Sequence, residues 1–420
     1  MTAPSPGPWW AHPGLTLVDG RLQIAGRDAE EVARTCGTPL YAYDLAHVGE
    51  QIGSLVDAVE RADLRAVVRV AMKAQHEPEV LEYIRRRFCA PGGNGVGIDV
   101  SSPGEVVRAL ECGWPPDLVS YTGTNVSARD LDVLLEAPIH INVDGLSQLR
   151  RLGLRSPGRS VGVRVNPRIG AAHGMGSVSL YCGGDKPTKF GIAPEKLPEA
   201  VAVAEEHGLL IDTLHAHVSR MVLNEDLATY EAVLGRMAEC ARLLQDLGCP
   251  LSEVNIGGGL GVPTREGEQP LDLDRVVSLW VKHLAPLGVA VGSENGEFFS
   301  RDAGILLVEV VSVEERDGVV FVGVDAGWNL FNLPFIFGQR HPIVLCRDAV
   351  GASPRPVTVA GNINQGPDLF AEECHLPEAR EGDILAVLAA GAYAQAASLD
   401  QHCLRPHAGE VVFEHRLSGA

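Results

Sequence analysis

One lysine stands near the end of an apolar run, and its amine is the first candidate for covalent chemistry. Residues 67–74 are rich in β-branched side chains, and Lys73 precedes a helix start at Pro78. The chain has only five lysines, so arginine is its usual cation. Arginine stays protonated, whereas a desolvated lysine can lose its proton and form an imine with a carbonyl group. A lysine that merely extends from the strand end into solvent is the structural alternative.

Further polar residues and glycines follow the ends of other apolar runs. They are Asp99, Arg164, His215, His217, Gly257, Gly258, Gly259 and Glu294. The glycines offer backbone amides that can wrap a phosphate, and a plain tight turn is the alternative. His215 and His217 alternate along a strand and so face one side, where either could stack on a cofactor or be a core histidine. We see no third ligand at metal spacing and expect no metal.

Glu294 completes a set of groups that suits one cofactor. A carboxylate at the end of the last strand could form a structural ion pair or could hold a proton on a ring nitrogen. A lysine, a phosphate loop, a stacking histidine and a carboxylate for a pyridinium together describe a pyridoxal phosphate site. No member of the set is specific alone, but the combination is.

The elements that must position these residues alternate between apolar runs and helical patterns. The apolar runs cover residues 67–74, 96–100, 118–122, 139–143, 161–165, 211–218, 254–256 and 290–292. Helical patterns between them include residues 103–110, 128–135, 197–206, 227–247 and 273–284. Eight strands alternating with helices predict an α/β fold, a (β/α)8 barrel whose chemistry collects at the carboxyl ends of its strands. A doubly wound open sheet is the alternative.

A second, mostly β domain is expected after about residue 304, where strand patterns follow one another with hardly any helix. They cover residues 305–313, 319–324, 342–345, 357–359, 384–388 and 411–413. Near the amino terminus, Asp19-Gly20 predicts a hairpin, which should join the β domain because a closed barrel has no free edge. The expected division is an amino-terminal segment at 1–38, a barrel at 39–303 and a carboxy-terminal β domain at 304–420.

Composition excludes several classes of protein. The 420 residues are 45% hydrophobic with a net charge of −19, which suits a globular protein and argues against a nucleic-acid partner. No apolar run approaches the ~20 residues of a membrane span, and the amino terminus does not read as a signal peptide. Nine dispersed cysteines without a Cys-x-x-Cys pair favour reduced thiols and a cytoplasmic location.

Seven segments of the chain match motifs of one known family: Tyr41-Ala42-Tyr43-Asp44, Ala71-Met72-Lys73-Ala74, residues 98–105, Arg164-Val165-Asn166-Pro167, Lys189-Phe190-Gly191-Ile192, Gly257-Gly258-Gly259 and Gly391-Ala392-Tyr393. Through them the chain resembles, over about residues 39–413, the barrel-type (fold type III) pyridoxal phosphate decarboxylases of the diaminopimelate and ornithine decarboxylase family. Together they are specific for the fold and the cofactor.

The resemblance implies roles for individual residues. The implied cofactor-binding residues are Lys73, Asp99, Arg164, His217, Gly257, Gly258, Gly259, Glu294 and Tyr393. Lys73 holds the aldehyde, His217 stacks on the ring and Tyr393 binds phosphate with the glycines; these three side chains are the implied catalytic groups. Glu294 keeps the ring nitrogen protonated, which favours decarboxylation, because racemases of this fold present an arginine there. The family also implies a homodimer with shared active sites.

Departures from the family pattern cluster on the substrate side. The residues concerned are Arg220, Glu297, Leu333, Phe337, Asn364 and Gln365. Glu297 and Leu333 replace arginines that grip the distal end of diaminopimelate, and Glu297 should repel a carboxylate. Phe337 replaces a tyrosine and so lacks its hydroxyl, and Gln365 replaces a glutamate and so lacks its carboxylate. Asn364 replaces a proton-donating cysteine, which leaves Lys73, Tyr393 or water to return the proton. Arg220 is added beside the phosphate or the substrate.

We therefore expect a pyridoxal phosphate-dependent decarboxylase of an atypical amino acid, in specialised metabolism, that is inefficient on meso-diaminopimelate. The amino acid could be free or tethered to a carrier protein. A true diaminopimelate decarboxylase with rearranged contacts is one alternative. A racemase, disfavoured by Glu294, and a non-catalytic cofactor-binding homologue are the others.

Overall fold

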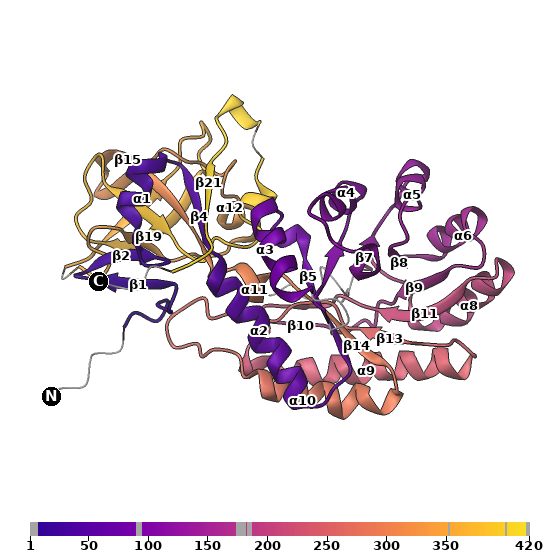
Figure 1. Cartoon of the computed structure of the whole chain (residues 1–420). Coiled ribbons are helices and arrows are strands. Elements are labelled where there is room, and N and C mark those ends of the chain that lie inside the picture. The colour runs from indigo at the N-terminus through magenta and orange to yellow at the C-terminus, as the bar shows by residue number, and fades with distance from the viewer. Residues whose placement is uncertain are drawn as a thin grey trace. The chain divides into compact units, whose positions relative to one another are not determined.

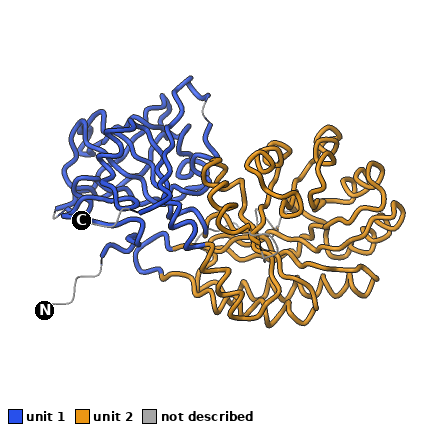
Figure 2. The backbone as a smooth tube through the Cα atoms, viewed as in Figure 1, with its two compact units in different colours: residues 1–51, 263–268, 299–420 blue, residues 52–262, 269–298 orange. Residues whose placement is uncertain are grey.

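The computed structural model describes residues 7–89, 95–173, 182, 187–351, 353–399 and 401–416. The chain forms two compact units, shown in separate colours in Figure 2. The β unit comprises residues 1–51, 263–268 and 299–420, and the barrel unit comprises residues 52–262 and 269–298.

Eight parallel strands close into a barrel, as the alternating pattern predicts. The strands are β5 (Ala66–Ala71), β6 (Gly97–Val100), β7 (Val119–Gly123), β8 (His140–Val143), β9 (Ser160–Arg164), β11 (Leu210–His215), β13 (Glu253–Asn255) and β14 (Ala290–Asn295). They pair in this order, and β14 returns to β5, so the expected (β/α)8 barrel is confirmed and the open sheet is excluded. The strand bounds lie within a few residues of the expected ones.

Helices follow the strands and lie around them, as Figure 1 shows. They are α3 (Pro78–Phe88), α4 (Pro103–Glu111), α5 (Ala128–Leu134), α6 (Leu146–Arg155), α8 (Leu197–Glu206), α9 (Leu227–Asp246) and α10 (Leu273–Leu284). Their starts have local causes: Ser102 accepts a hydrogen bond from the backbone N–H of Glu105 at the start of α4, and Asp272 caps α10 in the same way. Among the helices that the structure describes, none combines the length and apolar character that a bilayer crossing needs.

A buried ion pair joins two barrel strands. Arg69 on β5 donates from both terminal nitrogens to the two carboxylate oxygens of Glu253 on β13, at 2.5 and 2.8 Å. Both side chains are 11% exposed. The charge of Arg69, inside the apolar run 67–74, is therefore compensated by a carboxylate two strands away. The two strands are this close because β14, which lies between them, pairs with β5 and closes the barrel.

The β unit is built on one sheet. Its strands are β4 (Leu40–Asp44), β15 (Gly304–Arg316), β16 (Val319–Val324), β17 (Ile343–Leu345), β18 (Arg355–Ala360), β19 (Leu369–Leu376), β20 (Ile384–Val387) and β21 (Gly409–Phe413). Six strands follow the order β17-β20-β15-β16-β18-β19, and β4 pairs with both β15 and β21. The hairpin of β1 (Leu15–Val18) and β2 (Arg21–Ile24), with β3 (Arg27–Asp28) and α1 (Ala29–Cys36), lies in the same unit.

Several elements differ from the sequence expectations. The expected barrel start at residue 39 lies before β4, but β4 pairs with strands of the β unit, and α2 (Leu45–Arg61) follows it. The strand β19 was not expected. Its pairing with β18 is interrupted by register shifts and Glu373 has a positive φ of 53°, so its sequence does not alternate cleanly. The short helix α12 (Leu333–Phe337) was also not expected.

The Arg69–Glu253 pair generates a stability prediction. Glu253→Gln leaves a buried guanidinium without its compensating charge, so we expect the free energy of unfolding to fall by about 3–5 kcal/mol. The matched control is Glu239→Gln, since Glu239 is 60% exposed in its pair with Arg236 and should change stability by less than about 1 kcal/mol. Urea denaturation of both variants measures the difference; equal losses would refute the prediction.

Candidate active site

Lys73 and Asp99 meet at the carboxyl ends of the first two barrel strands. β5 ends at Ala71, and Lys73 lies in the single 3-10 turn that follows it. Because β5 pairs with β6, Ala71 is the register partner of Asp99, and the Lys73 Nζ lies 3.0 Å from the Asp99 Oδ2. The lysine side chain is 33% exposed, whereas Asp99 is 1% exposed. The amine is therefore accessible and is held by a buried carboxylate.

Glu294 on β14 is a second buried carboxylate in the same barrel. The Asn255 amide of β13 donates to its Oε1 at 2.6 Å, and the Nε2 of His215 on β11 lies 3.1 Å from its Oε2. Asn255 also accepts a hydrogen bond from the backbone N–H of Gly257 at 2.9 Å. One amide therefore connects the carboxylate to the glycine loop.

The two carboxylates titrate in opposite directions. Burial, together with the charge of Glu294, raises the pKa of Asp99 to about 6 against the opposing effect of Lys73. Burial also acts to raise the pKa of Glu294, but His215, Lys73 and Arg69 outweigh it and lower that pKa. Glu294 is consequently a carboxylate at neutral pH, as a partner for a protonated ring nitrogen must be.

His217 is a neutral ring beside the glycine loop. Its Nδ1 accepts a hydrogen bond from the backbone N–H of Gly258 at 3.2 Å, which leaves the proton on Nε2. Burial and the charges of Lys73 and Arg164 lower the pKa of His217 well below its usual value. An uncharged imidazole suits the stacking role that the sequence analysis assigns to it.

The glycine loop after β13 is shaped by close backbone contacts. Gly257 and Gly259 have positive φ values of 68° and 107°. A Cβ placed on Gly258 would lie 1.9 Å from the carbonyl oxygen of Glu294. The loop thus has no room for side chains. The N–H groups of Gly257 and Gly258 already donate to Asn255 and His217, so the Gly259 N–H is the loop amide that could be offered to an anion.

Arg164 at the end of β9 is held in place by two contacts. Its Nη1 lies 3.1 Å from the Asp144 Oδ1, and its guanidinium lies 4.4 Å from the ring centre of Phe190. Phe190 belongs to one of the segments that carry the family resemblance. The structure therefore gives Arg164 a structural partner, and its predicted contact with the cofactor stays a prediction.

Glu297 and Arg220, both predicted substrate residues, form an ion pair in the barrel unit. The Arg220 Nη2 lies 3.9 Å from the Glu297 Oε1, and the side chains are 16% and 8% exposed. The expected repulsion between Glu297 and a substrate carboxylate is weakened by this pairing, because the arginine compensates the charge.

The remaining predicted site residues lie in the β unit. Tyr393 has a positive φ of 55°, and the backbone N–H of nearby Gly391 donates to the carbonyl of Arg301 at 2.9 Å. Asn364 and Gln365 are exposed in the connection between β18 and β19. Phe337 is 38% exposed on α12, but Leu333 is 1% exposed and belongs to the interior of the unit.

Two residues that act on Glu294, namely Asn255 and Arg69, were not predicted from sequence, although each carried a signal. Asn255 stands two residues before the glycine loop, at the end of a buried strand. Arg69 is a charge within a β-branched run, and both signals mark polar groups inside a barrel. Their partners, Glu294 and Glu253, lie too far along the chain for spacing to reveal the contacts.

A group of three potential metal ligands lies in the β unit, where no metal was expected. Ligand atoms of His12, His47 and Asp302 lie within 4.8 Å of one another. The two imidazole rings stack, with centroids 3.9 Å apart and planes at 22°. In-plane lone pairs of nearly parallel rings do not converge on one ion, and both nitrogens of His12 contact backbone groups. The arrangement favours a stacked structural pair.

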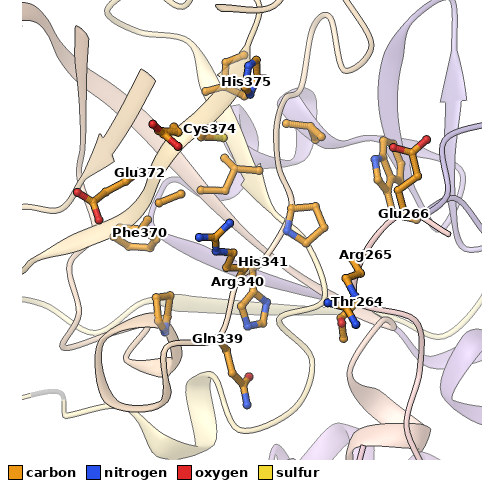
Figure 3. Close-up of a pocket in the computed structure, with 18 of the residues that line it drawn as sticks. Thr264, Arg265, Glu266, Gln339, Arg340, His341, Phe370, Glu372, Cys374 and His375 are labelled. Carbon is orange, nitrogen blue, oxygen red and sulfur yellow. The ribbon is translucent and has the colours of Figure 1, made fainter. Parts of the chain in front are cut away.

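A cavity of about 800 Å3 also lies in the β unit, bounded by β19 and by the loop before β17. Figure 3 shows Glu372, Cys374 and His375 along one wall, with Arg340 and His341 contributed by the loop. Burial raises the pKa of the Cys374 thiol to about 11, so it is not an activated nucleophile. None of the predicted site residues lines this cavity.

The residues of the barrel mouth fit pyridoxal phosphate. Lys73 offers an accessible amine, and the glycine loop packs so closely on the Glu294 backbone that it presents no side chain to a ligand. The buried Oδ1 of Asp99 has no hydrogen-bond partner among the described residues, and Glu294 is ionised. These groups supply an attachment point, an anion site and a counter-charge for a pyridinium.

Comparisons with known proteins agree with this chemistry. A family model described as "Pyridoxal-dependent decarboxylase, pyridoxal binding domain" matches residues 45–301. The chain is 34% identical to diaminopimelate decarboxylase of Methanothermobacter thermautotrophicus, covering 94% of this chain and 90% of the relative. It is 31% identical to the Escherichia coli K12 diaminopimelate decarboxylase, covering 90% and 89%. The crystal structure of diaminopimelate decarboxylase from Helicobacter pylori complexed with L-lysine superposes with a TM-score of 0.81 at 26% identity, covering 92% and 94%.

The raised pKa of Asp99 predicts a pH-dependent stability. The folded chain binds the proton of the Asp99 carboxyl group more tightly than the unfolded chain, in which the pKa of this group is 3.8. The resulting stabilisation of the fold is complete below pH 3.8 and is lost as pH rises through about 6. Asp99→Asn should therefore gain stability relative to the parent between pH 4 and pH 7, by on the order of 2 kcal/mol. Urea denaturation of cofactor-free protein measures it, with Asp132→Asn, 68% exposed, as control. A difference that is the same at both pH values would contradict the prediction.

Proposed function

The chain belongs to the pyridoxal-dependent decarboxylases, and we propose that it removes the α-carboxyl group of an amino acid with its cofactor attached at Lys73. The observation that carries this proposal is the placement of Lys73, Asp99 and Glu294 at neighbouring strand ends of one barrel. The ionised state of Glu294 supports decarboxylation over racemisation.

Different residues of the chain would bind different parts of the cofactor. When bound, pyridoxal phosphate supplies an electron-withdrawing ring that stabilises the charge developing as CO2 leaves. Lys73 would hold the aldehyde, with Asp99 orienting its amine. Glu294, fixed by His215 and Asn255, would keep a proton on the ring nitrogen. His217 would cover one face of the ring, and the glycine loop would bind the phosphate.

Diaminopimelate is the substrate that the relatives support. The proteins of Methanothermobacter thermautotrophicus and Escherichia coli K12 are named for it, and the similarity spans 90% and 89% of their lengths. The Glu297–Arg220 pair supports it too, because a compensated Glu297 no longer presents an unpaired negative charge to a distal carboxylate.

An amino acid with a different distal group is a second candidate, favoured by one observation. Leu333 stands where the family pattern has an arginine, and it lies in the interior of the β unit. That arginine's bidentate grip on a carboxylate cannot be supplied by leucine. Such a substrate could be free or attached to a carrier protein, and the pathway could be a specialised one.

A substrate assay separates the two candidates. If diaminopimelate is the substrate, we expect lysine and CO2 from the meso isomer with kcat/KM above about 10⁴ M⁻¹ s⁻¹. The second candidate predicts weak activity there and faster CO2 release from another amino acid in a panel with cationic, neutral and apolar distal groups. Release of CO2 from none of them, while the cofactor is bound, would contradict the proposed decarboxylation.

A cytoplasmic homodimer with shared active sites is the assembly that we propose. None of the nine cysteines, all of them among the described residues, forms a disulfide, which supports a reducing compartment. Phe335, Ile336 and Phe337 of α12 are 41%, 52% and 38% exposed, and three adjacent large apolar side chains support a buried contact in an assembly.

Sedimentation tests the assembly. We expect a particle of twice the 44.7 kDa chain mass, and we expect Ile336→Glu to shift it toward the monomer because a charge then enters an apolar contact. Leu404→Glu, on a residue that is 88% exposed, is the control. A monomeric parent at micromolar concentration, with the cofactor bound, would rule out the dimer.

A further inference from the structure

The glycine loop lies between two other segments of the barrel unit. On one side, its Gly259 carbonyl accepts from the backbone N–H of Val222 at 2.8 Å, and its Gly261 N–H donates to the Val222 carbonyl at 3.0 Å. On the other side, its Leu260 N–H donates to the Asn295 Oδ1 at 3.3 Å. The loop after β13 therefore touches the segment that follows β11 and the last residue of β14, the two strands beside β13 in the barrel.

Arg220 and Glu297 extend from those two flanking segments. Arg220 lies on β12 (Ser219–Arg220), two residues before Val222, and Glu297 begins α11 (Glu297–Ser300), two residues after Asn295. A Cβ on Gly259 would lie 2.4 Å from the Ser219 carbonyl, so the residue before Arg220 abuts the loop. Since the charged groups meet at 3.9 Å, the pair spans the loop.

The guanidinium suits this location chemically. It is planar, stays charged and presents five N–H donors in a fork that can serve two acidic groups at once. The separation of 3.9 Å from Glu297 is longer than a charge-assisted hydrogen bond of about 2.7–2.9 Å, which leaves the pair room to adjust. Backbone amides supply only partial charges to an anion, whereas an arginine supplies a full one.

We propose that Arg220 binds the phosphate of the cofactor and that Glu297 is the positioning residue that holds it over the glycine loop. This assignment rests on the proposed function, because the phosphate is that of pyridoxal phosphate. It takes both residues out of the distal part of the substrate site, where the sequence analysis placed them, and leaves substrate recognition to other side chains.

Cofactor binding without turnover tests the assignment. Cofactor-free protein is titrated with pyridoxal phosphate and with pyridoxal, which lacks the phosphate, and the visible absorbance reports each dissociation constant. We expect Arg220→Met to weaken the binding of pyridoxal phosphate by about 10- to 100-fold, the range for loss of a hydrogen bond to a charged group. The dissociation constant of pyridoxal should stay unchanged. Arg236→Met, which removes an arginine 42% exposed on α9, should alter neither.

A second pair of variants tests the role of Glu297. We expect Glu297→Gln to change the pyridoxal phosphate constant in the parent background and to have no further effect in the Arg220→Met background, since it acts through the arginine. Arg220→Lys keeps the charge without the fork, so its affinity for pyridoxal phosphate should fall between those of the parent and Arg220→Met. This variant also carries the test should Arg220→Met fail to fold.

The same titrations distinguish failure of the Arg220 assignment from failure of the proposed function. If Arg220→Met weakens the binding of both compounds equally, or the binding of neither, Arg220 does not bind the phosphate, and the proposed function stands. If the parent protein binds neither compound at Lys73, the proposed function itself is lost.

Discussion

A carboxylate buried inside the barrel is the constraint on which the site depends. Glu294 is 3% exposed, and a charge removed from water costs several kcal/mol unless other groups compensate it. Its partners His215 and Asn255 come from β11 and β13, while Arg69 on β5 and Lys73 in the turn after β5 also lower its pKa. β11, β13 and β14 are consecutive strands of the sheet, whereas β5 lies beside β14 only because the barrel closes. Closure of the barrel therefore brings two of the positive charges that keep Glu294 ionised.

The same contacts tie the carboxylate to the glycine loop. Asn255 binds Glu294 with its amide N–H and binds the Gly257 N–H with its carbonyl oxygen, and Gly258 packs on the backbone of Glu294. A change at either place must move the other. A ring nitrogen and a phosphate are the two ends of one rigid cofactor, so a scaffold that fixes both receptors together is suited to bind it.

The sequence predicted the barrel because its strands are buried runs separated by helical periodicity, and the eight runs lie within a few residues of the eight strands. It did not predict β19, whose bulged backbone at Glu373 hides the alternation. Local patterns identified Lys73, the glycine loop and Glu294. They could not reveal that Arg69 meets Glu253, or that Arg220 meets Glu297, because only the closed fold brings these residues together.

The central claim is that the cofactor is joined covalently to Lys73. Borohydride reduction fixes such a link, and peptide mapping then locates it, with Lys282→Ala as the control because Lys282 is 64% exposed in its pair with Glu231. The account predicts that the parent and Lys282→Ala carry the reduced cofactor on the peptide containing Lys73. Lys73→Ala should carry none and should lose the yellow colour. A yellow Lys73→Ala protein that borohydride still labels to the same extent would contradict the account.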